Sequence, residues 1–121
     1  MTLKECYAAL GGDYEEAISR LNSERIVQKF VLKFLNDSSY DLLCSAMEAE
    51  NYEEAFRAAH TIKGVCQNLS FTQLSDSSSH LTEVLRSGWS SENMPLMEQV
   101  KRDYQQVTEA IRTLQTEIEG K

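Results

Sequence analysis

The chain has 121 residues, of which 41% are hydrophobic and 26% charged, and its formal net charge at pH 7 is -7. This length suits one domain with a single core, and the composition is typical of a folded soluble chain rather than a disordered or membrane one. The negative charge disfavours nucleic acid and membrane surfaces as partners, because both are bound through clustered Lys and Arg.

Two further features suggest where the protein works. Residues 1–5 do not open a signal peptide, and no apolar run approaches the roughly 20 residues that span a bilayer. Cys6, Cys44 and Cys66 are odd in number and widely spaced, which favours reduced structural thiols over disulfides or a thiolate metal site. We therefore expect a cytoplasmic protein with no metal site.

The composition also predicts the fold class. Proline occurs once and glycine five times, and most other residues are good helix formers. No stretch alternates between apolar and polar residues as a strand does. We predict an all-α chain forming a single domain over residues 1–121.

The first two helices are predicted to be short. Residues 3–10 form the first, which ends at the Gly11-Gly12 pair, and Asp13 can cap the second over residues 14–21. We expect residues 1–22 to form a helical appendage to the main bundle.

A stronger helix is predicted to follow Ser23, which can act as its N-cap. Its apolar residues recur every three or four positions and predict one broad stripe facing the core: Ile26, Val27, Phe30, Val31, Phe34 and Leu35. The polar run from Asn36 to Ser39 is expected to interrupt or kink this helix, after which the apolar period resumes at Leu42.

Three more helices complete the predicted bundle. Asn51, with Glu54 three residues on, resembles a capping box and opens a helix over residues 52–69. Thr72 is expected to cap the next, over residues 73–87, and Asn93 with Pro95 to start a long one that reaches residue 118. Short connections imply antiparallel neighbours, so residues 23–118 are predicted to form an up-and-down four-helix bundle.

His60 stands on the polar side of the helix predicted over residues 52–69. At about 100° per residue, the apolar residues form one arc, and His60 lies roughly 160° from the middle of that arc. The arc contains Ala55, Ala58, Ala59, Ile62, Val65, Cys66 and Leu69. His60 is therefore predicted to face solvent, where it could serve as a nucleophile or be an idle surface residue.

The neighbours of His60 on this wheel suit phosphoryl chemistry. A neutral imidazole can attack phosphorus, and the Lys63 ammonium can stabilise charge on phosphoryl oxygens. Gly64 costs helix stability at a solvent-facing position, which suggests clearance for the phosphoryl group and a partner. Gln67 could bond a phosphoryl oxygen or the imidazole, or be an ordinary solvated residue.

Two further residues on this face are candidates for contacts with a partner. Phe56 and Arg57 precede His60 by about one helical turn and project toward the same side. An aromatic side chain on a charged face often marks a protein contact. The alternative for Phe56 is packing against a neighbouring helix.

The segment Ala59-His60-Thr61-Ile62-Lys63-Gly64 resembles the H-x-[LI]-K-G signature of the histidine phosphotransfer (HPt) family. This resemblance extends in outline over residues 23–116 and implies a four-helix bundle whose histidine is phosphorylated on Nε2. It implies that His60 receives the group from an aspartyl-phosphate receiver domain and that Lys63 and Gly64 serve as electrostatic and clearance residues. Ser70 and Thr82 depart from residues common in the family, at a helix end and in the packing.

The resemblance also implies the partners and cofactors. Response-regulator receiver domains or a hybrid sensor histidine kinase would be the partners of a monomeric phosphocarrier in a two-component phosphorelay. The sequence has no nucleotide-binding motif, so no ATP-dependent kinase activity of its own is expected. No intrinsic cofactor is expected either, and Mg²⁺ would be supplied by the receiver.

Two alternatives to the phosphocarrier remain. The first is a helical adaptor bundle that binds a partner without being phosphorylated. The second is a metal enzyme, but the other histidine, His80, lies on a different predicted helix and neither histidine has a paired carboxylate motif nearby. We expect His80 to be solvated or to flank the core.

Overall fold

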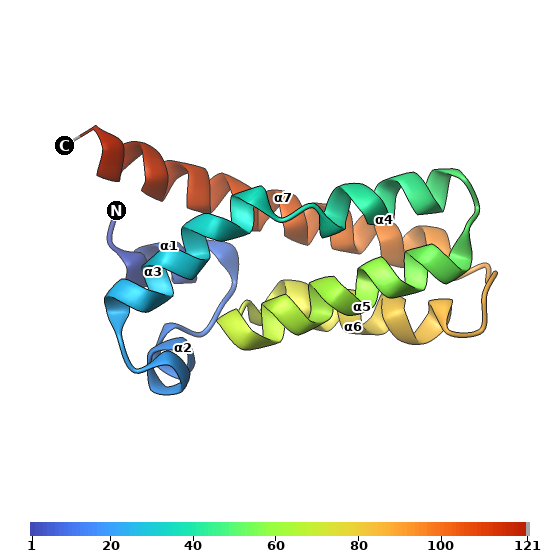
Figure 1. The fold of residues 1–121 in the computed structure, drawn as a ribbon, viewed down its shortest axis with the longest axis horizontal. Coiled ribbons are helices and arrows are strands. Elements are labelled where there is room, and N and C mark those ends of the chain that lie inside the picture. Colours follow the sequence, from blue (N-terminus) through green and yellow to red (C-terminus); the bar gives the residue numbers. More distant parts are fainter. Residues whose placement is uncertain (121) are drawn as a thin grey trace.

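The computed structural model describes residues 1–120, which form helices and their connections with no strand (Figure 1). This confirms the all-α prediction. In chain order the elements are α1 (Leu3–Leu10), α2 (Tyr14–Leu21), α3 (Glu24–Lys33), the 3-10 turn η1 (Phe34–Asn36), α4 (Ser39–Glu48), α5 (Tyr52–Leu69), α6 (Thr72–Leu85) and α7 (Asn93–Glu119).

The main helices pack lengthwise into an elongated bundle. Figure 1 shows α5 and α6 side by side below α4 and α7, with α3 leading along the bundle into α4. Short turns join α4 to α5 and α5 to α6, so these neighbours run in opposite directions. The four-helix bundle predicted from the apolar period is confirmed. None of the described helices combines the length and apolar character needed to cross a bilayer.

Capping side chains begin several helices where the sequence predicted them. The side chains of Asp13, Ser23 and Asn51 each accept a hydrogen bond from the backbone N–H three residues on, at the starts of α2, α3 and α5. The polar run after α3 does break the helix, because Asp37 is extended and its carboxylate accepts a hydrogen bond from the N–H of Ser39 at 2.8 Å.

Three details of the predicted helices were wrong. Thr72 is not the cap of α6; Phe71 occupies that position, and its ring, which is buried in the core, has no polar atom to make a cap hydrogen bond. The helix also ends at residue 85 rather than 87. In the turn that follows, Gly88 takes a left-handed φ of 88° and its backbone N–H donates to the Leu85 carbonyl. On α3, Ile26 and Phe30 are each 39% exposed, because the core-facing stripe is narrower than predicted.

The N-terminal helices pack into the core of the bundle. Tyr7 and Leu10 of α1 are each 1% exposed, and the Tyr7 ring packs against Phe71 with their centroids 5.7 Å apart. The Tyr7 hydroxyl donates to the Leu69 carbonyl at 2.8 Å, and the backbone N–H of Asp13 donates to the Ser70 carbonyl at the same distance. The first two helices therefore hold the C-terminal end of α5.

A Tyr7→Phe variant tests this attachment. It keeps the ring in the core and removes only the buried hydrogen bond to Leu69, so we expect the free energy of unfolding to fall by about 1 kcal/mol. Urea unfolding followed by far-UV circular dichroism measures the change. Tyr52→Phe is the control, because the Tyr52 hydroxyl makes no hydrogen bond within residues 1–120. An equal effect of both variants would contradict the proposed role of this bond.

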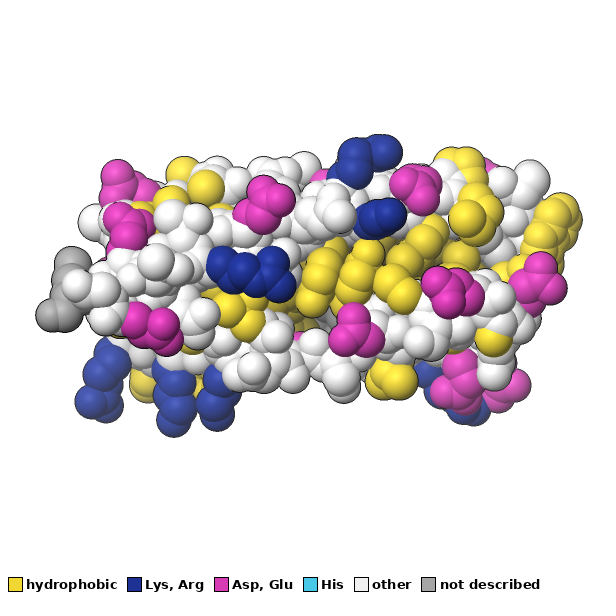
Figure 2. All heavy atoms as spheres, turned by 90° about the horizontal axis from the view of Figure 1, so that it is seen from above, with side chains coloured by type: hydrophobic (Ala, Val, Ile, Leu, Met, Phe, Trp, Pro, Cys, Tyr) yellow, Lys and Arg dark blue, Asp and Glu magenta, His cyan; other side chains and the backbone are white. Residues whose placement is uncertain are grey.

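One face of the bundle carries an exposed apolar groove between α4 and α7. Figure 2 looks onto this face, where apolar side chains form a band flanked by charged ones and neither histidine is visible. The groove has a volume of about 220 Å³, and its apolar lining includes Tyr40, Met47, Met94 and Met97. Beside it, the Tyr40 and Tyr104 rings stack 3.8 Å apart. The histidine face of the bundle lies elsewhere.

Candidate functional site

His60 lies in the middle of α5, on the side away from the bundle core. It is exposed, whereas the residues of the predicted apolar arc are buried, apart from the half-buried Val65. The straight 18-residue helix fixes this separation of faces, because one continuous helical period runs from residue 52 to residue 69. The His60 imidazole is thus open to a reacting partner, while packing of the opposite face of α5 against the core fixes the position of the helix.

An aromatic ring lies beside the imidazole. Phe56, one turn before His60, is half-buried, and the two rings are nearly parallel at an angle of 15°, with centroids 6.1 Å apart. The Arg86 guanidinium, from the C-terminal cap of α6, lies over the same Phe56 ring at 5.1 Å from its centroid. Phe56 therefore contacts both the imidazole side of α5 and a cation from the neighbouring helix.

Lys63 is half-buried on α5, one turn after His60, with Glu83 of α6 nearby. The hydrogen bond from Arg86 lowers the pKa of the Glu83 carboxyl, the charge of Arg86 lowers it further, and Lys63 and His60 have smaller effects in the same direction. The carboxyl is therefore ionised at neutral pH. An ionised carboxylate from α6 is therefore part of the surroundings of Lys63 and His60.

Gly64 lies on the exposed side of α5, four residues after His60. Apart from the adjacent backbone of α5 itself, a Cβ added at this position would meet no atom within 4 Å. Packing inside the chain therefore does not require glycine here, although glycine costs a helix roughly 1 kcal/mol relative to alanine. The open space beside the imidazole suits the predicted clearance role.

Gln67 lies about two turns after His60 on α5. Seven residues separate it from His60, or about 10 Å along the helix axis. The Gln67 carbonyl accepts a hydrogen bond from Arg20 of α2, which also bonds the Ser70 hydroxyl at 3.0 Å. Gln67 is therefore placed at the end of α5 that the N-terminal helices hold, and a role toward His60 stays a prediction.

Arg57 is exposed and is paired along its own helix. Its guanidinium bonds Glu53 at 2.7 Å and also bonds Glu54. Exposed pairs of this kind contribute little to stability and exchange easily, so Arg57 is available to a docking partner. Its contact with a partner stays a prediction.

Sequence reasoning missed two residues of this site, Glu83 and Arg86. They form an ion pair at 3.1 Å between the last turn of α6 and its C-terminal cap, and their side chains are 59% and 58% exposed. The i to i+3 spacing of opposite charges was a visible signal of this pair. Its position beside Phe56 depends on the register between α5 and α6, which no local pattern in the sequence gives.

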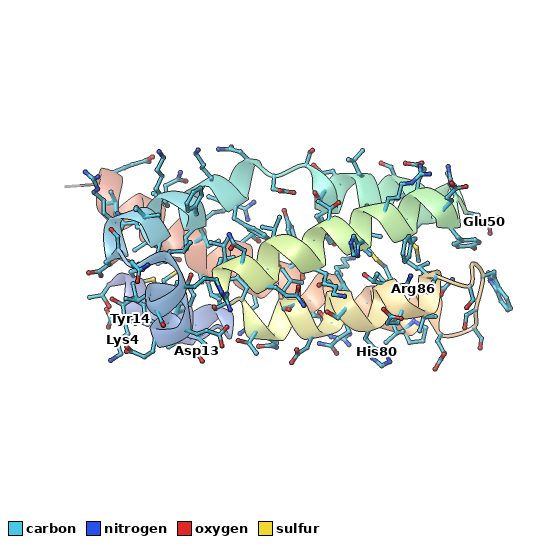
Figure 3. The ribbon with its side chains drawn as sticks, turned by 60° about the horizontal axis from the view of Figure 1, so that its bottom comes forward. Lys4, Asp13, Tyr14, Glu50, His80 and Arg86 are labelled. Carbon is cyan, nitrogen blue, oxygen red and sulfur yellow. The ribbon has the colours of Figure 1, made fainter. Side chains whose placement is uncertain are left out.

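His80, Cys6 and Cys66 are poorer candidates for a reactive site than His60. His80 is exposed on α6, and Figure 3 shows it on the edge of that helix that faces away from α5. Burial raises the pKa of the Cys6 thiol to about 11 and raises that of Cys66 further, so both stay protonated at neutral pH. Within residues 1–120, no three His, Cys, Asp or Glu side chains are placed to hold a metal ion.

Comparison with known proteins identifies the family. The family model described as "Hpt domain" matches residues 29–110, a range that contains η1, α4, α5 and α6, the second half of α3 and most of α7. The comparisons with curated proteins and with solved structures gave no match. The matched range covers most of the chain and includes His60, Lys63 and Gly64, and the chain therefore belongs to the Hpt domain family, whose function is histidine phosphotransfer in phosphorelays.

Proposed function

We propose that this chain is a phosphocarrier that accepts a phosphoryl group on His60 from the aspartyl phosphate of a receiver domain and passes it to another receiver. The observation that supports this most directly is the exposed imidazole in the middle of α5, with Lys63 one turn on and open space at Gly64. The family match makes receiver domains and sensor kinases of two-component systems the expected class of partner.

The proposed step is an in-line transfer of the phosphoryl group. The neutral Nε2 atom of His60 attacks phosphorus, the bond between phosphorus and the aspartyl oxygen breaks, and the aspartate leaves as a carboxylate. The imidazolium formed then loses its Nδ1 proton to solvent. Transfer to the next receiver reverses these steps, with a second aspartate as the nucleophile.

This chain and its partner would supply different parts of the site. Lys63 offers a cation to the phosphoryl oxygens, and the rigid helix α5 positions the nucleophile. The receiver would hold the Mg²⁺ and the acceptor aspartate. We propose no kinase activity for this chain, since the phosphoryl group comes from its partner.

The same proposal includes a cytoplasmic location and a monomeric carrier. The cysteines Cys6, Cys44 and Cys66 are all free, which suits a reducing compartment. A carrier that serves two receivers in turn needs a modest and short-lived interface with each. The exposed side of α5 around Phe56, Arg57 and Gly64 is the surface that we propose for it.

Incubation with a phosphorylated receiver domain and Mg²⁺ tests the function. We expect intact-mass measurement to detect one phosphoryl group on this chain, and we expect the adduct to be acid-labile and alkali-stable, as a phosphohistidine is. Addition of an unphosphorylated receiver should then remove the group. If several active receivers and the small donor phosphoramidate all leave the chain unmodified, the adaptor bundle becomes the better explanation.

A further inference from the structure

Glu83 and Arg86 form a two-point ion pair next to the histidine face. The Nη2 atom of Arg86 lies 3.1 Å from Oε1 of Glu83, and its Nε atom lies 3.4 Å from Oε2. In Figure 3 the labelled Arg86 lies between α5 and α6, on the opposite edge of α6 from His80. The guanidinium therefore approaches the helix that bears the nucleophile.

The ion pair between Glu83 and Arg86 can open easily, so Arg86 can bind another anion. Both side chains are more than half exposed, and exposed pairs are held by little free energy. A phosphoryl group offers more charge and three acceptor oxygens, and the planar fork of arginine matches such groups well. Arg86 would therefore prefer a phosphoryl group on His60 to the carboxylate that it binds now.

The Phe56 ring lies next to both the Arg86 guanidinium and the His60 imidazole. Arg86 lies over the Phe56 ring at 5.1 Å, and the same ring is nearly parallel to that of His60. A cation resting on an aromatic face keeps its N–H groups free at its edges. A rotation of the flexible arginine side chain across Phe56 would bring those N–H groups toward a phosphoryl group.

Glu83 disfavours phosphorylation of His60, whereas Arg86 favours it. The hydrogen bond and the charge of Arg86 hold the pKa of the Glu83 carboxyl below the ordinary value, with smaller effects from Lys63 and His60, so the carboxylate is ionised at neutral pH. A phosphoryl group on His60 would repel this carboxylate and compete with it for the same cations. Glu83 thus occupies Arg86 when His60 is free and opposes phosphorylation.

We propose that Arg86 is a second phosphoryl-binding cation of this site, which leaves Glu83 and bonds the phosphoryl oxygens when His60 is phosphorylated. Glu83 then sets how readily the site takes up the group, as the competing partner of Arg86. This inference rests on the proposed function of His60 and adds two residues from α6 to a site otherwise formed by α5.

The test compares three variants in their initial rate of phosphorylation by phosphoramidate, followed by intact mass. We expect Arg86→Gln to be about fivefold slower than the wild type and Glu83→Gln about twofold faster, both differences shrinking at high salt. Arg102→Gln is the matched control, because Arg102 also bonds a residue three positions earlier on its own helix, Gln99 on α7. We expect this control to react at the wild-type rate.

The opposite signs separate phosphoryl binding from a structural role, since loss of a structural ion pair would affect both variants alike. In ¹⁵N NMR spectra, the Nε–H signal of Arg86 should shift on phosphorylation of the wild type, and that of Arg102 should not. An Arg86→Gln rate equal to that of the control, a slower Glu83→Gln, or an unchanged Arg86 signal would overturn the inference. A wild type that takes up no phosphoryl group would overturn the proposed function as well.

Discussion

We expect a His60→Gln variant to take up no phosphoryl group from a phosphorylated receiver or from phosphoramidate. Glutamine has a similar length and polarity, but its amide nitrogen has no lone pair available to attack phosphorus. The position is exposed in the middle of α5, so the substitution removes no core contact and α5 should keep its structure. We expect complete loss of the acid-labile adduct with an unchanged far-UV circular dichroism spectrum.

His80→Gln is the control for this result. His80 is the other histidine of the chain and is exposed on α6, away from α5 (Figure 3). This variant should be phosphorylated at the wild-type rate. An acid-labile adduct that persists in His60→Gln and is lost in His80→Gln would move the reaction to α6 and refute the site proposed around His60.

The side of α5 that bears His60 could be predicted because it depends on one helix alone. Asn51 fixes where α5 begins, and the unbroken period from Ala55 to Leu69 fixes which side is buried. His60, Lys63 and Gly64 then follow from their place in that period. The buried face of a long amphipathic helix such as α5 can be predicted from its own sequence.

Contacts between helices could not be predicted in the same way. The position of Arg86 over Phe56 depends on how α6 slides and turns against α5, and many registers satisfy the same apolar pattern. Tyr7 presents a similar case, since its hydroxyl bonds the Leu69 carbonyl 62 residues away. A segment expected to be an appendage therefore proved to hold the end of the histidine-bearing helix.

The exposure of Ile26 and Phe30 has another cause. An apolar period predicts which side of a helix can be buried, but the packing of its neighbours decides how wide the buried stripe becomes. Val27 and Val31 occupy the centre of that stripe on α3 and are fully buried. Their two neighbours lie at its edge, where no other helix covers them completely.

Substitution of Gly64 should also have a large effect. We expect a side chain at this position to stabilise α5 and, if it is bulky, to slow phosphoryl transfer from a receiver. Apart from the adjacent backbone of α5 itself, a Cβ at Gly64 would meet no atom within 4 Å, so Gly64→Ala should raise the free energy of unfolding by about 1 kcal/mol. Gly64→Leu should also fold stably, but its side chain would stand about 6 Å from that of His60, one turn away on the same face. A docking receiver would have to pass over it.

We therefore expect Gly64→Leu to accept the phosphoryl group from a receiver at least about tenfold more slowly than the wild type, since in-line transfer tolerates little displacement of the reacting atoms. Phosphoramidate is small enough to reach the imidazole past the leucine, and its rate should change by less than about twofold. Ala8→Leu, which adds similar bulk at an exposed position on α1, should affect neither rate. Receiver transfer at the wild-type rate in Gly64→Leu would show that clearance is not the reason for glycine, and a less stable Gly64→Ala would place its role in folding.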